Sequence, residues 1–480
     1  MARSATPAAE LRARLGHPVI DSDGHLLELI PVLRGYFFDV ARELGGSAAA
    51  IELARSEGLT FDERVLRPWS GRSEAERRER WASRPPFWSL PVEPAIDRAT
   101  GYLPRLLHER LDDMGLDFAV LYPSRTLPIV SIPNAELRQL ACRAVNRYHA
   151  ELYAEFADRL APVAVIPMHT PEEAIAELEA AKALGLRSAL LNGVVHRPLA
   201  DGSTRPDSFG IDSPHDYDPV WARCVELGLA PAFHASGQGW GSRRSISSYV
   251  YNHIGSFGAS GEAVCKSLFL GGVTRRFPGL CFAALEGGVA WACSLSADLV
   301  SHWEKRNAGA MRRLDPAALD VDAVMGFMAK YGDARIREQL PAIRDFLQAG
   351  EPAPPRLDEW AAVGVERAEE LADLFVPRFY FGCEADDPSV AWAFDARLNP
   401  FGARLRPLFS SDIGHWDVPD MLGVLPEAHE LVDDGHITPD DFRELTFENA
   451  VRFYASLNPD FFRGTRVERE AAELLATTPA

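Results

Sequence analysis

Several common signals are missing from this sequence of 480 residues. Its six cysteines are scattered and form no C-x-x-C pair, as expected for reduced, mostly buried thiols of a cytosolic protein. It has no run of about 18 apolar residues, so no transmembrane helix is predicted. The stretch from Met1 to His17 has no apolar core, so we expect no secretory signal and a cytoplasmic location.

Basic residues are in the minority, and the usual nucleotide motifs are absent. The chain has 50 lysines and arginines against 69 aspartates and glutamates, a formal net charge of −19. This charge disfavours nucleic acid and anionic membranes as partners, although a local pair such as Arg243 and Arg244 still allows an anionic small substrate. No GxxxxGK[ST], strand-placed GxGxxG or GxSxG pattern occurs, so neither a phosphate loop nor a serine nucleophile is predicted.

Short apolar runs alternate with helical stretches, which is typical of a parallel α/β fold. Eight runs are candidate strands: Pro18–Asp23, Asp117–Tyr122, Ala161–Pro167, Ser188–Asn192, Ala230–His234, Leu280–Leu285, Arg378–Gly382 and Arg406–Ser410. The helix expected at Pro171–Leu184 begins with a capping Thr170, a proline and two glutamates. Eight strands with helical crossovers predict a (β/α)8 TIM barrel, with residues 1–480 forming a single domain.

Two of the gaps between strands are too long for one crossover helix. We interpret residues 26–116 and 301–376 as helical insertions after the first and sixth strands. Both follow the carboxyl ends of strands, where barrel enzymes place their sites, so we expect them to cover that face as a lid. Their aromatic residues would either wall an apolar pocket or serve as ordinary packing: Trp69, Trp81, Phe87, Trp88, Trp303, Phe327 and Tyr331.

Metal-binding residue types stand where four of these runs end. Asp23 and His25 close the first strand, His234 the fifth, Glu286 the sixth and Asp412 the eighth. The carboxyl ends of barrel strands share one rim, so these side chains are expected to converge on a metal ion. A carboxylate after five apolar residues is costly to bury unless it is paired or bound to metal, so the alternative for Glu286 is a salt bridge.

Three residues on the loops beyond the strands are further candidates. His253 would complete a metal shell near His234, or else pack near the surface. His415 is a candidate ligand, an acid/base group or a helix cap. Glu28, shortly after the first strand, is placed with His415 among the candidate catalytic groups.

The I-D-x-D-x-H opening, the strand-five His234 and the S-D-x-x-H at strand eight resemble the amidohydrolase-2 group of the amidohydrolase superfamily. The resemblance runs from about Gly16 to Glu468, and it implies a metal-dependent hydrolase or nonoxidative decarboxylase on a (β/α)8 barrel. The chain departs from the usual pattern. Asp23 replaces the first histidine of H-x-H, Glu286 replaces a strand-six histidine, and no lysine ends strand four. These departures weaken the case for hydrolytic activity.

The segments at 252–255, 285–291, 411–417 and 458–465 are similar to those of TIM-barrel nonheme diiron monooxygenases of platensimycin and platencin biosynthesis. That resemblance implies hydroxylation of an apolar, terpenoid-like substrate in secondary metabolism, which can be a CoA thioester, with an external electron donor. It implies two iron ions on six residues: Asp23, His25, His234, His253, Glu286 and Asp412.

Two alternatives to the diiron monooxygenase stay open at this point. The first is a mononuclear Zn or Mn hydrolase or nonoxidative decarboxylase, with Glu286 or His415 as the acid/base group. Its ion would be held by Asp23, His25, His234 and Asp412. The second is a barrel that has lost catalysis and kept a binding pocket. By analogy with barrels of this size, a homodimer is also expected.

Overall fold

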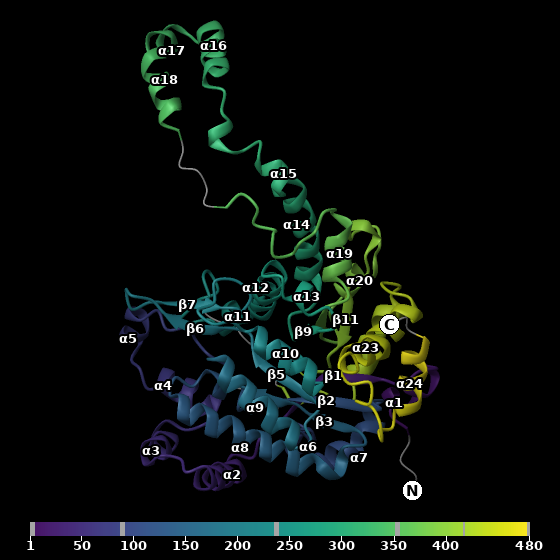
Figure 1. The fold of residues 1–480 in the computed structure, drawn as a ribbon. Coiled ribbons are helices and arrows are strands. Elements are labelled where there is room, and N and C mark those ends of the chain that lie inside the picture. The colour runs from purple at the N-terminus through teal and green to yellow at the C-terminus, as the bar shows by residue number, and fades with distance from the viewer. Residues whose placement is uncertain (1–4, 87–91, 235–239, 351–355, 416–417, 478–480) are drawn as a thin grey trace.

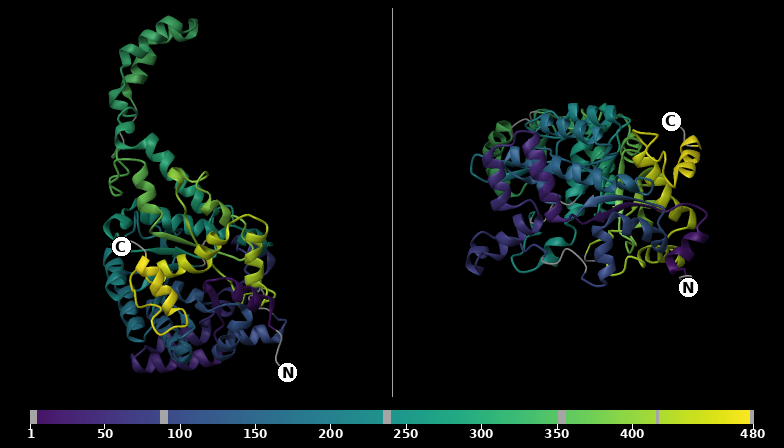
Figure 2. Two further views of the ribbon diagram at one scale, coloured as in Figure 1. Left: turned by 90° about the vertical axis from the view of Figure 1, so that its right-hand side faces the viewer. Right: turned by 90° about the horizontal axis from the view of Figure 1, so that it is seen from below.

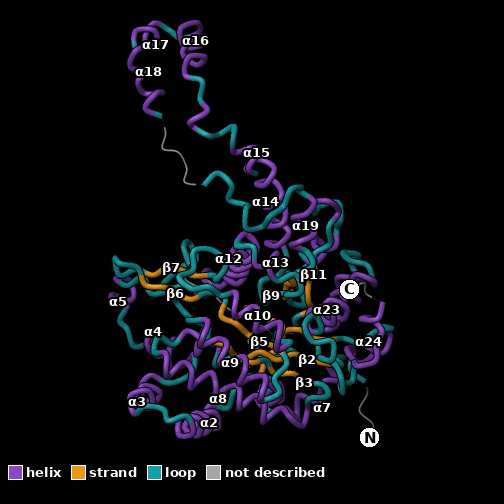
Figure 3. Tube along the Cα trace, viewed as in Figure 1, coloured by secondary structure: helices purple, strands orange, loops and turns teal. Residues whose placement is uncertain are grey.

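The computed structural model describes residues 5–86, 92–234, 240–350, 356–415 and 418–477. Short strands lie at the centre of the main body, and helices surround them (Figure 3). One group of helices leaves this body and extends away from it (Figure 1). The architecture is therefore mixed α/β, as the alternation of apolar runs predicts.

The central strands form two parallel sheets. The first has the order β1-β2-β3 and the second the order β11-β10-β9-β8-β5-β4. Their bounds are β1 Ile20–Leu26, β2 Phe118–Pro123, β3 Leu160–Pro162, β4 Ala164–Ile166, β5 Ser188–Asn192, β8 Ala230–His234, β9 Phe282–Ala284, β10 Phe379–Cys383 and β11 Arg406–Phe409. All eight predicted strands are confirmed, and the third is divided between the two sheets at Val163.

Hydrogen bonds join β1 to the segment that follows β11. The Asp412 amide donates to the Asp23 carbonyl oxygen at 3.0 Å, and the His25 amide donates to the Ile413 carbonyl oxygen at 3.0 Å. These bonds bring the first and last strands of the fold side by side, although they are almost 390 residues apart in sequence.

Helices connect the strands and cover the sheets. The expected helix after Thr170 is confirmed as α9. The Thr170 side chain caps its start by accepting a hydrogen bond from the Glu173 amide. The helices outside the two insertions are α1 Pro7–Arg14, α8 Ala135–Tyr153, α9 Pro171–Ala183, α10 Asp218–Leu227, α11 Tyr249–His253, α12 Ser256–Leu270, α13 Val273–Arg276, α14 Ala290–Arg306, α20 Val390–Phe394, α21 Val424–Asp433, α22 Pro439–Arg443, α23 Asn449–Tyr454 and α24 Glu468–Thr477. A small antiparallel hairpin, β6 Val195–Pro198 and β7 Thr204–Asp207, lies outside the sheets.

The first insertion packs against the body. Its helices are α2 Ile30–Glu43, α3 Ala48–Glu57, α4 Arg67–Ser70, α5 Glu74–Glu79, α6 Ala95–Tyr102 and α7 Pro104–Met114. Helix α2 lies on α8, and Phe37 and Val40 of α2 are buried in a cluster that α8 shares. The insertion therefore extends the body beside the sheets (Figure 1).

The second insertion does not cover the sheets, contrary to expectation. It forms an arm that points away from the body in Figure 1 and in the left view of Figure 2: α15 Ala308–Met311, α16 Val321–Tyr331, α17 Ala334–Glu338 and α18 Leu340–Ala349. The physical reason is α14, whose 17 residues carry the chain about 25 Å from β9 before the arm begins. Helix α19, Glu369–Phe375, brings the chain back to β10. Within the described ranges, no helix is both long and apolar enough to cross a membrane.

Candidate metal centre

Five of the predicted ligands meet at the carboxyl ends of the strands. His25 Nε2 and His234 Nε2 lie 3.2 Å apart. His25 Nε2 is also 3.2 Å from Asp412 Oδ1, and His234 Nε2 is 3.0 Å from Glu286 Oε2. Asp23 Oδ1 lies 3.5 Å from His234 Nε2 and 3.8 Å from His25 Nε2. The structure brings these five side chains together, because parallel strands deliver their last residues to the same edge.

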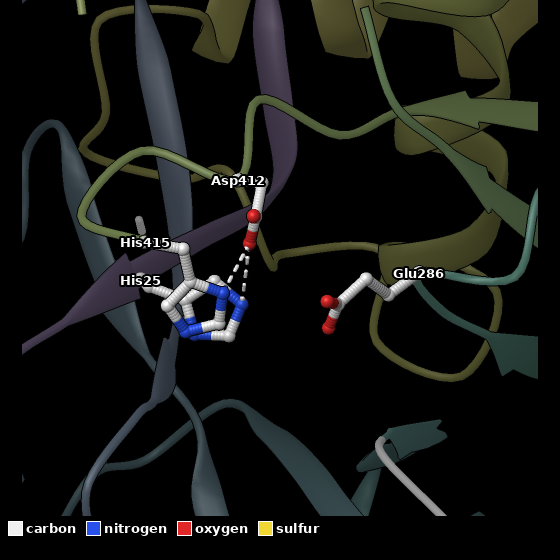
Figure 4. A group of neighbouring side chains, drawn as sticks. All are labelled: His25, Glu286, Asp412 and His415. Carbon is white, nitrogen blue, oxygen red and sulfur yellow. Dashed lines mark ion pairs between the residues drawn. The ribbon is translucent and has the colours of Figure 1, made fainter. Parts of the chain in front are cut away.

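His415 joins this group from the loop after β11. Its Nδ1 lies 2.7 Å from Asp412 Oδ1, and its ring stacks on His25 with the ring centroids 3.6 Å apart (Figure 4). On its other side, His415 Nε2 lies 3.2 Å from Ser124 Oγ, next to β2. One carboxylate oxygen of Asp412 thus faces two imidazole rings, those of His25 and His415 (Figure 4).

Two of the converging carboxylates sit on unusual backbone. Glu286 has a φ of 56° and Asp412 a φ of 50°, in the left-handed region that non-glycine residues seldom occupy. Such a conformation costs free energy unless the surrounding structure enforces it, and it is frequent at functional sites. At both positions the strand has just ended, and the left-handed turn aims the carboxylate toward His25 and His234.

Burial and charge set the protonation of the cluster. Burial, with His415 and His234 nearby, holds the pKa of His25 well below its usual value. Burial also disfavours charge on His234, but the carboxylates of Asp23 and Glu286 outweigh it and raise the pKa of His234 to about 10. Burial raises the pKa of Asp23. The cluster therefore favours positive charge at its centre, which a divalent ion supplies when it is bound.

Two predicted site residues lie apart from the cluster. His253, at the end of α11, lines the same cavity but stacks on Tyr249, with ring centroids 5.0 Å apart, and belongs to neither group of mutually close ligand atoms. Glu28 is fully buried and accepts hydrogen bonds from the Arg125 amide and the Thr126 hydroxyl. These bonds hold Glu28 to the loop after β2, and Glu28 is not among the described residues that line the cavity.

Asp21 supports the cluster and was not predicted as a site residue. Its carboxylate accepts hydrogen bonds from the Ser411 amide at 2.9 Å, the Ser411 hydroxyl at 2.6 Å and the Asp23 amide at 3.2 Å. Burial raises the pKa of Asp21 to about 7. Asp21 lies two residues before Asp23, so the alternation of side chains along a strand places it on the same face as the expected ligands. Its place in the I-D-x-D-x-H segment is the signal that could have revealed it.

An apolar cavity of about 310 Å³ opens beside the cluster. The polar residues of its lining include His234, Glu286 and His415 of the cluster, together with Ser124, Ser131, Asn192, His196 and His253. Its aromatic and aliphatic walls include Phe61, Leu127, Val130, Leu190, Trp240, Tyr249 and Phe257. This lining contains none of the five described aromatic residues that were expected either to wall a pocket or to serve as packing: Trp69, Trp81, Trp303, Phe327 and Tyr331. Phe87, Trp88, Trp416 and Asp417 lie outside the described residues.

The donor atoms suit a divalent metal ion. His25, Glu286, Asp412 and His415 have ligand atoms within 4.8 Å of one another, as do Asp23, His25 and His234. Mixed imidazole and carboxylate ligands are those that Zn²⁺ and Mn²⁺ take in proteins. Both groups include His25, and all of its short contacts use Nε2. Because Nε2 has a single lone pair, it can bind only one metal ion, so the two groups cannot each use it for a separate ion. The geometry therefore fits one centre better than the two ions expected for a diiron enzyme.

A comparison with protein families shows which family the chain belongs to. Residues 20–455 match the amidohydrolase family, and the chain belongs to that family. This confirms the family resemblance seen in the sequence.

Individual relatives add to this picture. A segment of the chain is 31% identical over 163 residues to decarboxylase orsB of Emericella nidulans, covering 31% of this chain. The chain spans 43% of the length of this curated relative. The structure is similar to an amidohydrolase from Mycobacterium avium subsp. paratuberculosis, with a TM-score of 0.54 and 16% identity, over 92% of this chain and 100% of that one. A dihydroxybenzoic acid decarboxylase from a Polaromonas species, solved with manganese and an inhibitor, matches with a TM-score of 0.48 and 17% identity over 91% and 97% of the two chains.

Proposed function

We propose that this chain is a metal-dependent nonoxidative decarboxylase acting on a small unsaturated acid, such as a hydroxylated aromatic carboxylic acid. The observation that carries the proposal is the convergence of His25, His234, Glu286 and Asp412 at the edge of an apolar cavity. Membership of the amidohydrolase family and the partial likeness to a decarboxylase support it. Among the functions that the sequence leaves open, this one was the alternative to the diiron monooxygenase.

We propose that the two parallel sheets belong to one (β/α)8 barrel in a single domain. The hydrogen bonds between β1 and residues 412–413, and the division of one predicted strand between β3 and β4, support a continuous ring of strands. In such a ring the centre lies at the rim where the carboxyl ends of the strands meet.

One Zn²⁺ or Mn²⁺ ion would be held by His25, His234 and Asp412, with Glu286 or Asp23 as a further ligand. Such an ion would supply a Lewis acid beside the cavity, and this would stabilise the negative charge that develops during the reaction. Asp21 holds the backbone that carries Asp23 and Ser411, and so positions ligands from both ends of the chain.

The side chains of the cavity would position the substrate and supply a proton. Leu127, Leu190 and Phe257 would enclose the ring and exclude water. Decarboxylation breaks the bond between the ring carbon and the carboxyl carbon, releases CO2 and leaves an electron pair that takes up one proton. His415 lines the cavity and has Nδ1 2.7 Å from Asp412 Oδ1, so this pair can hold that proton beside the substrate.

The test combines elemental analysis with an assay of CO2 release. Protein purified without oxygen should contain one Zn or Mn per chain and release CO2 from a member of a hydroxybenzoate panel, with or without oxygen. His234→Gln should lose both metal and activity. His302→Gln, which changes an exposed histidine on α14, should keep both. Two iron ions per chain, or turnover that requires oxygen, would instead support the monooxygenase and refute the decarboxylase.

No described feature favours the diiron reading over this one. The CoA-linked substrate, the external electron donor and the homodimer expected from the sequence stay predictions.

A further inference from the structure

A second hollow, of about 880 Å³, adjoins the cavity and is lined by arginines. Arg64, Arg72, Arg80 and Arg244 line it together with Trp69. No aspartate or glutamate occurs among the described residues that line it. We call this hollow the arginine depression. Such a concentration of positive charge is unusual on a chain whose net charge is −19.

The arginine depression is built from two segments that are far apart in sequence. Arg64, Arg72 and Arg80 belong to the first insertion, whereas Arg244 follows β8. The two segments are tied together, because Trp81 Nε1 donates to the Arg244 carbonyl oxygen at 3.2 Å and Arg244 Nε donates to the Trp81 carbonyl oxygen at 2.6 Å. The Arg84 amide also donates to the Ser245 carbonyl oxygen at 2.8 Å. The arginines thus come together through specific contacts.

Two of the guanidinium groups are available for a ligand. The Arg72 and Arg80 side chains have no hydrogen bond or ion pair to another residue within the described ranges. The carboxylate of Glu76, which is close enough to feel their charge, accepts hydrogen bonds from the Ser73 amide and hydroxyl instead. Arg64, by contrast, is paired with Glu57 at 3.0 Å. Arginine side chains bind phosphate and carboxylate groups with paired, charge-assisted hydrogen bonds.

The arginine depression and the cavity share part of their walls. His196 of β6 and Trp240 line both hollows, and their rings meet edge to face with centroids 6.4 Å apart. A molecule that fills the apolar cavity and extends past these two rings would bring its far end to the arginines. The two hollows are therefore suited to one elongated ligand with an apolar end and an anionic end.

We propose that the arginine depression binds an anionic group, a phosphate or a second carboxylate, carried by the substrate beyond the part that reacts. The proposal rests on the proposed function and narrows its substrate class to acids with a distal anion. Arg72 and Arg80 bind that anion, and the net positive charge of the depression draws it to the mouth of the cavity.

The test is a calorimetric titration of the metal-loaded full-length protein at low ionic strength, with phenyl phosphate, phenylacetate and phenol as probes. An anionic probe should bind at least about tenfold more tightly than phenol, and Arg72→Glu/Arg80→Glu should remove that preference. The matched control is Arg312→Glu/Arg313→Glu, which makes the same charge change on the arm and should leave binding as in the wild type. Circular dichroism confirms that both variants are folded.

Each result of the titration either identifies the anionic group or overturns the proposal. A preference for phenyl phosphate assigns a phosphate, and a preference for phenylacetate assigns a carboxylate. Equal binding of all three probes to the wild type, or an equal loss in the two double variants, overturns the proposal. The titration does not depend on turnover, so a protein that binds the anionic probe but releases no CO2 would refute the decarboxylase alone.

Discussion

Some residues of the candidate metal centre must meet both a chemical and a conformational requirement. Asp412 must present a carboxylate to two imidazole rings and must also occupy left-handed backbone. Asparagine tolerates that backbone at least as well as aspartate does, whereas most residues do not. The two demands can therefore be separated experimentally.

We expect Asp412→Asn to fold normally and to lose metal, because the substitution keeps the left-handed turn and removes the charge. Metal affinity should fall by about 10-fold to 100-fold, measured by competition with a chelator. The matched control is Asp212→Asn, an exposed aspartate with a φ of 56° that lies outside the cluster. Unchanged metal affinity in Asp412→Asn would contradict the assignment of Asp412 as a ligand.

Asp21 is predicted to contribute to stability through Ser411. Asp21→Ala leaves the buried Ser411 amide and hydroxyl without their acceptor, so the free energy of unfolding should fall by about 3 kcal/mol in urea titrations. Ser411→Ala removes only the hydroxyl and should cost about 1 kcal/mol. The double variant should be less destabilised than the sum of the two, since the residues share one contact. Additive effects would show that the contact contributes little.

Some site residues could be predicted from the sequence and others could not. Asp23, His25, His234, Glu286 and Asp412 follow apolar runs, and the end of a strand has a fixed place in a parallel sheet. Glu28 lies on a loop and His253 ends the short helix α11, and the positions of both depend on tertiary contacts that no local pattern specifies. The separation of Glu28 from the cavity therefore had to come from the structure.

At the scale of elements, the strands were easier to predict than the insertions. Each strand is a short run of buried residues, so its composition alone marks its position. The direction taken by the second insertion depends instead on the length of α14, which decides where the arm leaves the body. The sequence of the arm itself does not predict the direction in which the arm points.

The arm is predicted to be the first part of the chain that a protease cuts. Phe327, Tyr331 and Phe346 are 65%, 70% and 77% exposed, and α18 has no buried residue, so little packing opposes local unfolding there. Brief trypsin treatment should cleave between Arg312 and Arg344 and leave two fragments that stay associated and keep their metal. Mass spectrometry of the fragments checks this, and initial cleavage within residues 5–86 or 356–477 would contradict it.

The whole molecule should lose stability in mild acid. His149 is fully buried and donates from Nδ1 to the Val163 carbonyl oxygen at 2.9 Å, and burial lowers the pKa of His149 to about 4. The unfolded chain takes up a proton at this residue below its ordinary pKa of about 6.5, but the folded chain does not. Stability is therefore complete above pH 6.5 and falls as the pH drops toward 4, by up to about 3 kcal/mol from this group.

The variant His149→Phe tests the assignment. It loses one hydrogen bond and should be less stable at pH 8, yet its free energy of unfolding should fall less between pH 6.5 and 4 than that of the wild type. His302→Phe, at an exposed position, should leave the wild-type slope unchanged. Urea unfolding at several pH values measures both. Identical slopes for His149→Phe and the wild type would assign the acid sensitivity to other groups.

The direction of the arm has a practical consequence. The turn between α16 and α17, at the outer end of the arm, lies far from the strands (Figure 1). A fluorescent protein or an affinity peptide spliced into that turn would leave the centre untouched. This turn is therefore a suitable attachment site for tethering the protein to a surface or for marking its orientation in electron micrographs.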